Sequence, residues 1–401
     1  MTTRRIIILG STGSIGTQAL DVIAHVNTLH AAGRSPDRLE VVGLAAGANA
    51  SLLAEQAAAF NVRDLALREG DPTRVTGAGL RVGPDAAERL VREVDCDLVL
   101  SAMVGLAGLP ATLAAIELRR DLALANKETL VAAGAIVIPA ISRAGVMLYP
   151  VDSEHAGAYQ AFRRCAAAPP PLWCGDETVR LTLTASGGAF RDWPAGRAAT
   201  ATPADAMRHP TWRMGPKVTI DSASLMNKAL ELIEAHHMFN LPASKLDAVI
   251  HPQSIVHALV EYADGSVVAQ LALPDMRLPI QAALTGEDIL PGMAPRLDLA
   301  AVGSLTFYPI DHERFPAVRL GLRAIEAGGT AGAILNAANE EAVRLFLDPV
   351  AKLPFDRITD LAVRALDAVP VRDVTCLRDV LDADAKAREW VRSAYTKAGA
   401  Q

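Results

Sequence analysis

The sequence predicts an α/β protein, with a doubly wound parallel sheet at the N-terminus, an α+β region in the middle and a bundle of helices at the C-terminus. Short apolar strands alternate with helical segments over residues 1–151, which is the pattern of a parallel sheet covered on both faces. Over residues 152–286 strands surround one long helix, and residues 312–401 have helical spacing. Residues 287–311 are punctuated by Pro and Gly, so we expect a linker there.

Individual elements can be placed within each predicted domain. In the first, strands are expected at 5–9, 39–47, 64–68, 95–105, 121–128 and 146–151, with helices after residue 10, at 50–60, at 108–119 and before residue 146. In the second, strands are expected at 179–185, 217–221, 247–251, 255–262 and 266–273, with a helix at 224–240 and a hairpin turn at 264–265. In the third, helices are expected at 316–329, 331–347, 357–369 and 384–399.

Composition narrows the classes of function. The chain has 401 residues, 51% of them hydrophobic, which suits two or three domains with a sizeable core. A formal net charge of −6 argues against a nucleic-acid-binding surface. The cysteines Cys96, Cys165, Cys174 and Cys376 form no CxxC pair, which favours a reduced, cytoplasmic compartment. The most apolar stretch, 129–151, is interrupted by Gly, Pro and Arg, and the first apolar run is too short for a signal peptide, so no membrane segment is expected.

A glycine-rich loop, GSTGSIG at 10–16, lies between the first strand and the first helix. Glycines permit a tight turn that brings backbone N–H groups close to a pyrophosphate at a helix N-terminus. The spacing GxxGxxG differs from the usual GxGxxG, and a plain strand–helix turn is the alternative. The position at the start of an α/β domain favours a Rossmann-like dinucleotide site.

The end of the second strand bears on the choice of dinucleotide. Residues 45–49, AAGAN, carry no acid that could hold the 2′-hydroxyl of an NAD ribose. NADP is therefore favoured, although no Arg or Lys stands in this segment either.

Four polar residues, Asp152-Ser153-Glu154-His155, follow an apolar run at 144–151. In an extended segment residues two apart face the same way, so Asp152 and Glu154 would point together and would need a cation or a shared proton. Hard oxygen ligands suit Mg²⁺ or Mn²⁺. The alternative is a solvated strand end with two unrelated acids. Alternation would turn Ser153 and His155 the other way.

The long predicted helix carries a matching polar set. Asn227, Lys228, Glu231 and Glu234 are spaced three or four residues apart, so they share a face. A surface stripe of Lys–Glu pairs is the alternative. The preceding segment 221–224, DSAS, has the chemistry of an N-cap, where a phosphate could share the donors.

Two loops are candidates for ligand contacts. The Ser-Gly-Gly turn at 186–188 would expose N–H groups and a hydroxyl to an anion, and a simple turn explains it equally well. The segment 206–217 carries His209, Trp212 and Met214 between a Pro and a Gly. So much apolar area on a loop indicates a lid over a ligand, or a loop packed on its own domain.

Eight motifs in this order resemble one family, and they are GSTGSIG (10–16), LANKE (124–128), PVDSEH (150–155), ASGGAFR (185–191), RHPTWRMG (208–215), DSASLMNKALELIEA (221–235), HPQSIVH (251–257) and NAANE (336–340). The chain is similar to the 1-deoxy-D-xylulose 5-phosphate reductoisomerases of the non-mevalonate isoprenoid pathway, over residues 5 to about 395. The resemblance implies an NADPH-binding domain, a catalytic domain and a C-terminal helical bundle, in a homodimer.

The resemblance also implies roles for single residues. The implied metal ligands are Asp152, Glu154 and Glu231. The implied substrate-binding residues are Lys127, Ser153, Ser186, His209, Ser222, Asn227, Lys228 and Glu231, with Ser186, Ser222, Asn227 and Lys228 toward the phosphate. The implied cofactor-binding residues are Thr12, Gly13, Ser14, Ile15, Gly47, Asn49, Asn126, Glu128 and Gly215. The candidate catalytic residues are Lys127, Glu154, His209, Trp212 and Glu231, with Trp212 in the lid. Ala48 departs from the Lys or Arg of many members.

The implied reaction explains these residue types. A divalent cation, Mg²⁺ or Mn²⁺ with Co²⁺ as a third candidate, would chelate the adjacent oxygens of a ketose phosphate as a Lewis acid. The carbon skeleton would rearrange by a retro-aldol/aldol route or an α-ketol shift, and the aldehyde would accept hydride from NADPH to give 2-C-methyl-D-erythritol 4-phosphate. Two other classes compete: a simple NADP-dependent dehydrogenase, whose activity would not need the metal, and a non-catalytic NADPH sensor.

The remaining histidines are given supporting roles. His257 matches a family histidine near the site, and His155 is expected to be structural or to support the metal ligands. His236 and His237, near the end of the long helix, are expected to interact with its dipole. The polar residues of the C-terminal helix are expected to cap or pair structurally, and they are Asn336, Asn339, Glu340 and Glu341.

Overall fold

The computed structural model describes residues 3–75, 79–162, 177–194, 196–212, 214–286 and 288–399. Cys165, Cys174, Arg213 of the predicted lid and Glu287 at the start of the predicted linker lie outside these ranges. Among the helices described, none has the length and apolar character needed to cross a membrane.

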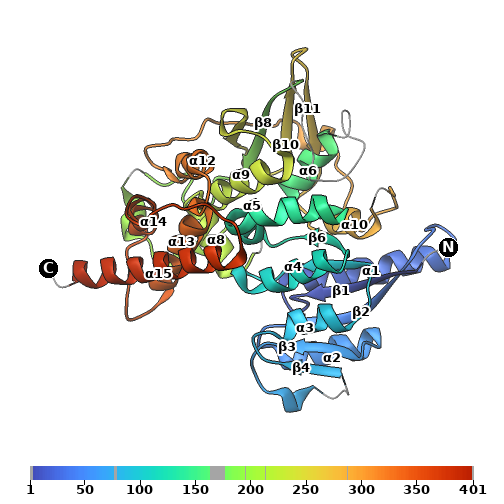
Figure 1. Ribbon diagram of the computed structural model, residues 1–401. Coiled ribbons are helices and arrows are strands. Elements are labelled where there is room, and N and C mark those ends of the chain that lie inside the picture. Colours follow the sequence, from blue (N-terminus) through green and yellow to red (C-terminus); the bar gives the residue numbers. More distant parts are fainter. Residues whose placement is uncertain are drawn as a thin grey trace.

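The first sheet is parallel and has the order β4-β3-β2-β1-β5-β6-β7 (Figure 1). Its strands are β1 (Thr3–Leu9), β2 (Arg38–Ala46), β3 (Asp64–Leu67), β4 (Gly79–Val82), β5 (Leu98–Ser101), β6 (Asp121–Leu124) and β7 (Leu148–Pro150). The strand order reverses at β1, which pairs with β2 on one side and β5 on the other. The crevice at the carboxyl ends of such strands is the usual ligand position of a doubly wound sheet.

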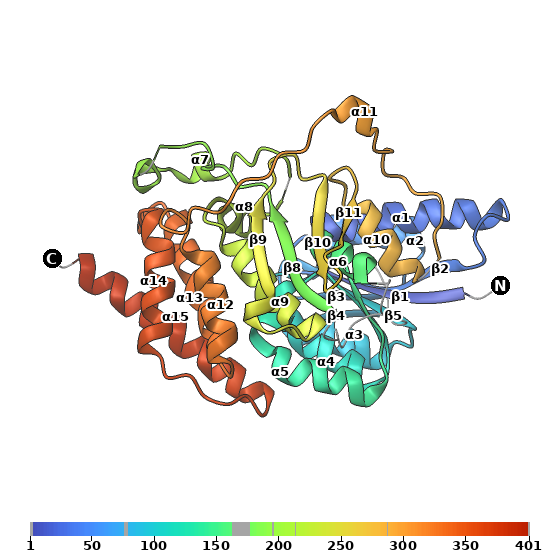
Figure 2. The same cartoon turned by 90° about the horizontal axis from the view of Figure 1, so that it is seen from above.

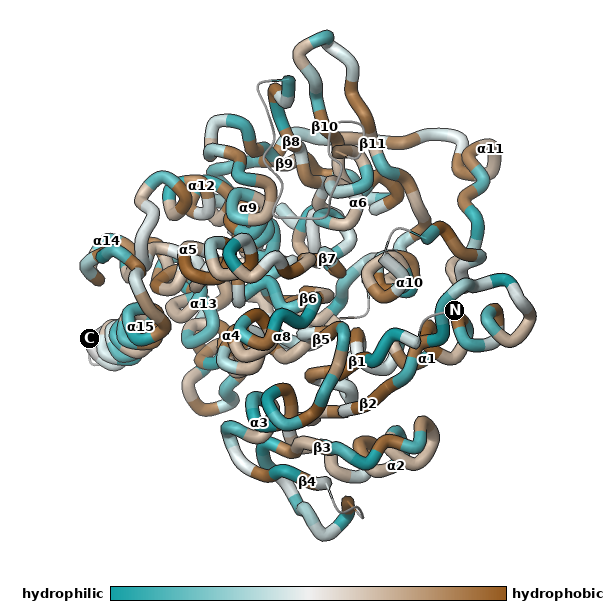
Figure 3. Tube along the Cα trace, turned by 45° about the vertical axis from the view of Figure 1, so that its right-hand side comes forward, coloured by the Kyte–Doolittle hydropathy of each residue, from teal (hydrophilic) through white to brown (hydrophobic). Residues whose placement is uncertain are grey.

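Helices cover both faces of this sheet. They are α1 (Ser14–Ala31), α2 (Ala50–Phe60), α3 (Ala86–Glu93), α4 (Leu109–Glu117) and α5 (Lys127–Ala144), with the short turns η1 (Pro72–Arg74) and η2 (Gly105–Gly108). Along β1, Ile6 and Ile8 join one apolar cluster while Ile7 and Leu9 join another. The predicted parallel sheet with two covered faces is therefore confirmed, and Figure 3 shows brown, apolar residues along β1 and β2.

One helix from much later in the chain also packs on this sheet. Helix α10 (Arg277–Thr285) lies beside α1 (Figure 2) and places Ile280, Ala283 and Leu284 in the same cluster as Ile6 and Ile8. This helix was not predicted from the sequence.

The second sheet has four strands in the order β11-β10-β8-β9. They are β8 (Thr178–Ala185), β9 (Leu246–Ile250), β10 (Val256–Tyr262) and β11 (Val267–Leu271). The hairpin between β10 and β11 turns at Asp264-Gly265, as predicted, and Gly265 has a φ of 82°. The accompanying helices are α6 (Ser153–Phe162), α7 (Pro203–Ala206), α8 (Pro216–Ala223) and α9 (Met226–Phe239), with η3 (Arg197–Thr200) and η4 (Ala243–Lys245).

Helix α9 packs against α5, the second sheet and the C-terminal helix α12. The C-terminal helices are α12 (Ala317–Ala327), α13 (Ala331–Leu347), α14 (Asp356–Ala368) and α15 (Leu377–Gly399), drawn in orange to red in Figure 1 and preceded by the short α11 (Leu299–Val302). Glycines let α9 approach its neighbours: a Cβ at Gly321 of α12 would lie 2.7 Å from the Ala229 carbonyl oxygen. The predicted helical C-terminal region is confirmed.

Two secondary-structure predictions are wrong at positions that matter for the site. Residues 217–221 form part of helix α8 rather than a strand, because Pro216 at the first helical position and the Lys217–Asp221 ion pair both favour a helix. Residues 152–154 are not extended, since β7 ends at Pro150 and α6 begins at Ser153.

The boundaries of other predicted elements also differ from those in the structure. The predicted strands ending at 105 and 128 stop at Ser101 and Leu124, and Lys127 already belongs to α5. The predicted N-cap at 221–224 lies mostly within α8, and α9 starts only at Met226, after Leu225 with a φ of 59°. Two helices separated at Leu225 thus stand where one strand and one helix were predicted.

Candidate active site

The glycine-rich loop forms a tight turn between β1 and α1. Gly10 has a φ of 88°, and a Cβ there would lie 2.6 Å from the Ala102 carbonyl oxygen. A Cβ at Gly16 would lie 2.4 Å from the Gly10 carbonyl oxygen, so only glycine fits at either position. Gly13 is the N-cap of α1 and has no side chain to satisfy the first N–H groups. Those groups are therefore available to an anionic ligand.

A cavity of about 750 Å³ runs from this loop to the second sheet. It brings together most of the predicted site residues, namely Gly13, Ser14, Ile15, Asn126, Lys127, Glu128, Asp152, Ser153, Glu154, Ser186, His209, Trp212, Gly215, Ser222, Asn227, Lys228 and Glu231. Three predicted cofactor residues, Thr12, Gly47 and Asn49, do not line it. Gly47 and Asn49 follow β2, where the Asn49 side chain accepts a hydrogen bond from the Leu52 N–H as the N-cap of α2.

The predicted carboxylate set is assembled from two helices. Oxygen atoms of Asp152, Glu154 and Glu231 all lie within 4.8 Å of one another. Asp152 directly precedes α6, Glu154 is in the first turn of α6, and Glu231 lies in the middle of α9. The Glu154 N–H points to Asp152 Oδ1 at 3.4 Å, so a helix start brings the two acids together rather than strand alternation.

Two buried lysines accompany the three carboxylates. Lys127 Nζ lies 2.7 Å from Asp152 Oδ2 and 2.9 Å from Glu231 Oε1. Lys228 Nζ lies 2.7 Å from Glu154 Oε1 and also contacts Glu231. The carboxylates of this cluster offer hard oxygen donors, which fit Mg²⁺ or a similar divalent cation.

The charges of this cluster shift one another's protonation. Burial, followed by the charge of Glu231, raises the pKa of Glu154 to about 7. Burial would also raise the pKa of Asp152, but the charges and hydrogen bonds of Lys127 and His155 together outweigh burial and hold the pKa well below its usual value. Asp152 is therefore the permanent anion, and Glu154 is the member whose charge depends on a nearby cation.

His155 lies behind the carboxylates instead of facing away from them as predicted. Its Nε2 lies 3.0 Å from the Glu231 carbonyl oxygen, and its Nδ1 lies 3.6 Å from Glu234 Oε2 and 3.9 Å from Asp152 Oδ1. Since a carbonyl only accepts, Nε2 carries a hydrogen. Although burial favours the neutral ring, Glu234 and Asp152 raise the pKa of His155 to about 9. A charged His155 therefore supports the carboxylates from behind.

On the side of the second sheet, one histidine joins two serines. His209 Nε2 lies 3.0 Å from both Ser186 Oγ and Ser222 Oγ. His209 Nδ1 accepts hydrogen bonds from the backbone N–H groups of Thr211 and Trp212, so the ring hydrogen is on Nε2. Burial lowers the pKa of His209 to about 4, so the ring is neutral.

The Ser-Gly-Gly turn at 186–188 packs closely on α8. Gly187 and Gly188 have φ values of 89° and 67°, and a Cβ at Gly188 would lie 2.3 Å from the Ser222 carbonyl oxygen. The Gly188 N–H donates to Ser186 Oγ at 3.2 Å. The two glycines thus bring Ser186 and Ser222 to the same end of the cavity.

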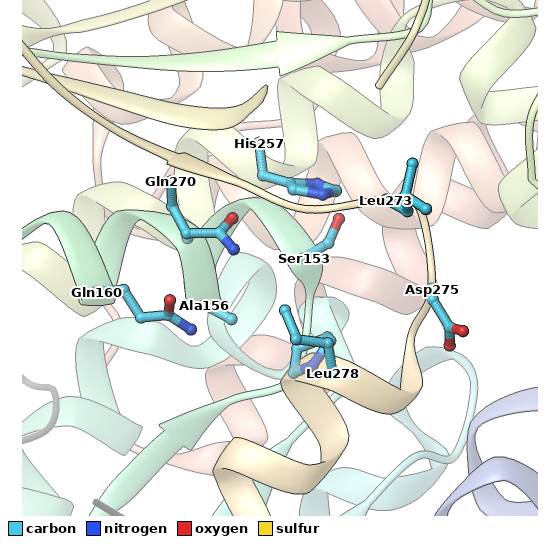
Figure 4. Close-up of a pocket in the computed structure, with 10 residues that line it drawn as sticks. Ser153, Ala156, Gln160, His257, Gln270, Leu273, Asp275 and Leu278 are labelled. Carbon is cyan, nitrogen blue, oxygen red and sulfur yellow. The ribbon is translucent and has the colours of Figure 1, made fainter. Parts of the chain in front are cut away.

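The loop after α7 lies over the same end. Trp212 and Met214 line the cavity, and the Trp212 ring centroid lies 6.4 Å from that of His257. A second, small cavity of about 10 Å³ adjoins the site, and Figure 4 shows Ser153, His257 and Gln270 around it. That volume suits a single water molecule.

Several residues at the site were not predicted. Lys217 pairs with Glu128 and Asp221 at 2.9 Å each, and the Asn339 amide donates to Asp221 Oδ1 at 2.8 Å. This network joins α5, α8 and α13, and it confirms that a residue of the NAANE motif pairs structurally. Cavity-lining residues without a prediction include Gln18, Asp21, Met103, Val104, Thr211, Leu225, Ser254, Asp275, Met276 and Arg277.

The fold and the site define a dinucleotide-dependent enzyme with a cluster of three carboxylates between two sheets. Three family models match successive parts of the chain. The model described as 1-deoxy-D-xylulose 5-phosphate reductoisomerase matches residues 6–134. The model of the 1-deoxy-D-xylulose 5-phosphate reductoisomerase C-terminal domain matches residues 148–239, and the model of the DXP reductoisomerase C-terminal domain matches residues 271–390. The chain belongs to the 1-deoxy-D-xylulose 5-phosphate reductoisomerase family.

Curated relatives and solved structures agree with this family. The reductoisomerase of Gloeobacter violaceus is 48% identical, with 97% of each chain covered, and that of Mycobacterium avium is 46% identical, with 98% of this chain and 93% of the relative covered. A Zymomonas mobilis structure in complex with NADPH has a TM-score of 0.84 at 36% identity, covering 98% of this chain and 99% of the other. A DOX-P reductoisomerase in complex with NADPH, fosmidomycin and magnesium has a TM-score of 0.88 at 33% identity, with 98% of each covered.

Proposed function

We propose that this chain converts 1-deoxy-D-xylulose 5-phosphate to 2-C-methyl-D-erythritol 4-phosphate, using NADPH and a divalent cation, in the synthesis of isoprenoid precursors. The chain is thus an NADP-dependent oxidoreductase. The observation that carries the proposal is the convergence of Asp152, Glu154 and Glu231 in the cavity that also reaches the glycine-rich loop. Membership of the family, over nearly the whole chain, supplies the substrate.

Three carboxylates are assigned to the metal. Asp152, Glu154 and Glu231 would hold Mg²⁺ or Mn²⁺ through their oxygens. A cation bound there supplies Lewis-acid polarisation of the ketose oxygens. Lys127 and Lys228 already neutralise part of the acidic charge and could turn toward substrate oxygens when the metal takes their place beside the carboxylates.

The phosphate end is assigned to the second sheet and the helices beside it. Ser186, Ser222 and the Nε2–H of His209 offer three neutral donors at one end of the cavity. Asn227 and Lys228, at the start of α9, add an amide and a positive charge. Binding the phosphate at a distance from the reacting carbons supplies energy that holds the substrate through both chemical steps.

The nucleotide end is assigned to the first sheet. The N-terminus of α1, with Gly13, Ser14 and Ile15, would take the pyrophosphate, and Asn126 and Gly215 line the path toward the metal. NADPH supplies the hydride for the reduction step. Glu128 is held by Lys217 and by the Asn126 amide, so it orders this wall of the cavity.

The lid is assigned to residues 206–216. Trp212 lies over the cavity, and its backbone is tied to His209, which contacts the phosphate-binding serines. A ligand that draws His209 toward Ser186 and Ser222 would therefore hold the lid closed and exclude water from the reacting carbons.

The remaining expectations belong to the same proposal. We propose a homodimer in the cytoplasm, divided into a nucleotide domain (1–151), a catalytic domain (152–286), a linker (287–311) and a helical domain (312–401). Family resemblance supports the dimer, and cysteine usage supports the compartment. The packing of α10 on the first sheet ties the end of the catalytic domain to the nucleotide domain.

The deciding experiment measures NADPH oxidation at 340 nm with the ketose phosphate, with and without Mg²⁺. We expect turnover only with the metal, and at least a ~100-fold loss in Glu231→Gln, because catalysis loses a metal ligand. Glu340→Gln, which breaks an ion pair with Arg388 away from the carboxylate cluster, is the matched control and should keep its activity. Metal-independent turnover would favour a simple dehydrogenase, and NADPH binding without turnover would favour a sensor.

A further inference from the structure

The position that would hold the adenosine ribose has no basic residue of its own. In doubly wound folds an acid near the end of β2 binds the ribose 2′-hydroxyl of NAD, whereas an Arg nearby accommodates the 2′-phosphate of NADP. Here the residues after β2 are Gly47, Ala48 and Asn49, all exposed and none charged. If this chain selects NADPH, the positive charge must come from another segment.

The segment after β3 lies directly against these residues. The Arg68 N–H donates to the Ala46 carbonyl oxygen at 3.1 Å, and the Glu69 N–H donates to that of Gly47 at 2.9 Å. A Cβ at Gly70 would lie 2.6 Å from the Ala48 carbonyl oxygen, and Gly70 has a φ of 103°. This contact therefore requires glycine, and it fixes the loop after β3 beside the loop after β2.

Two arginines of this segment lie close to the loop after β2. Arg68 follows β3 directly and is exposed, and no acidic side chain pairs with it in the part of the chain that the structure describes. Arg74 ends the short turn η1, and its Nη1 donates to Ser51 Oγ, in the first turn of α2, at 3.1 Å. The two arginines thus border the Gly47–Asn49 loop from the side of β3 and from the side of α2.

Neighbouring acids do not neutralise this pair. Asp71 is held by its own turn, accepting from the Thr73 N–H at 3.0 Å and the Thr73 hydroxyl at 2.6 Å. It lies 3.6 Å from Arg74 Nε, with both side chains more than half exposed, so the attraction is weak. Glu69 is exposed as well. Arg74 is thus able to exchange Asp71 for a doubly charged phosphate, which a guanidinium binds with two parallel hydrogen bonds.

We propose that Arg68 and Arg74, with the hydroxyl of Ser51, bind the 2′-phosphate of NADPH and set the preference of this chain for NADPH over NADH. The proposal rests on the proposed function for the identity of the cofactor. The two arginines take the role of the basic residue that Ala48 does not provide, from a neighbouring loop that Gly70 holds in place.

The test measures cofactor binding to the full chain without substrate or metal. Dissociation constants for NADPH and NADH are obtained from nicotinamide fluorescence for the wild type, Arg68→Ala, Arg74→Ala and the double variant. A hydrogen bond to a charged group contributes about 10- to 100-fold in affinity, and exposure to solvent reduces this for both guanidinium groups. We therefore expect the double variant to bind NADPH at least roughly tenfold more weakly. The constant for NADH should change less than about twofold, and Arg74→Lys should keep part of the NADPH affinity.

Arg63→Ala is the matched control. Arg63 is exposed and stands just before β3, at the opposite end of the strand, so its loss removes the same charge without touching the ribose position. Equal weakening of NADPH and NADH in the double variant, an unchanged NADPH constant, or a wild type that binds both cofactors equally would overturn the proposal. A wild type that binds neither cofactor would overturn the proposed function as well. The failure of the proposed function can therefore be told apart from a failure of the arginine proposal alone.

Discussion

Gly134 of α5 lies against the imidazole ring of His237 of α9, and a Cβ at position 134 would lie 2.3 Å from the ring carbons. This contact lets the helix that carries Lys127 pack on the helix that carries Glu231. We therefore expect Gly134→Ala to lower the free energy of unfolding by about 1–3 kcal/mol, because the ring must move within a packed interface. Urea unfolding measures the loss.

A double-mutant cycle identifies the cause. If the clash with the ring is responsible, Gly134→Ala combined with His237→Ala should cost less than the sum of the two single changes. Additive costs would show that Gly134 matters for another reason, such as the flexibility of α5.

The same histidine makes stability depend on pH. Burial against α5, and then the neighbouring His236, lowers the pKa of His237 to about 3, whereas an unfolded histidine titrates near pH 6.5. Between these two pH values the unfolded chain binds more protons at His237 than the folded chain does. The contribution of the neutral, buried His237 ring to stability is therefore complete above pH 6.5 and is lost as the pH falls. The free energy of unfolding changes through this group by at most about 1.4 kcal/mol per pH unit. Urea unfolding between pH 7.5 and 5 should give a shallower pH dependence for His237→Gln than for the wild type, and parallel curves would contradict the assignment.

The carboxylate centre could be predicted from the sequence, but its local geometry could not. Asp152 and Glu154 were paired by assuming an extended segment, in which His155 would face away. The structure pairs them at the start of α6, where the helical repeat turns His155 toward Glu234. The few residues after a buried strand are compatible with an extended segment or with the start of a helix. The packing of α6 against the second sheet selects the helix.

Long-range partners were likewise outside the reach of local patterns. The run KVTID at 217–221 has the β-branched residues of a strand, yet it forms α8 and directs Lys217 to Glu128, a residue far away in the chain. Helix α10 joins the first sheet from the end of the second predicted domain. In α8 the local helix signals of Pro216 and the Lys217–Asp221 pair outweigh the β-branched residues, and α10 is placed by a tertiary contact. The apolar strands of the first sheet, which alternate with helices, needed no such information.

Removal of a phosphate-end hydroxyl should affect substrate binding more than chemistry. Ser222 Oγ shares the Nε2–H of His209 with Ser186, away from the carboxylates. Ser222→Ala should raise KM for the ketose phosphate about tenfold, as expected for a hydrogen bond to a charged group, and change kcat less. Thr200→Ala, which removes an exposed hydroxyl from η3, is the control. A fall in kcat without a change in KM would place Ser222 at the reacting carbons instead.

The ion pairs of Lys127 predict a link between stability and metal. Its Nζ lies between Asp152 and Glu231, and removing one partner of a buried pair costs about 3–5 kcal/mol because the other charge is left unpaired. Lys127→Ala should therefore be strongly destabilised in EDTA. A divalent cation at the same carboxylates would restore the missing positive charge, so Mg²⁺ should raise the melting temperature of the variant more than that of the wild type. Thermal unfolding with and without Mg²⁺ measures both effects. Lys245→Ala, in η4 away from the carboxylates, controls for the loss of a lysine. If Mg²⁺ raises the melting temperature equally in the wild type, Lys127→Ala and Lys245→Ala, then Lys127 does not share its carboxylates with the metal.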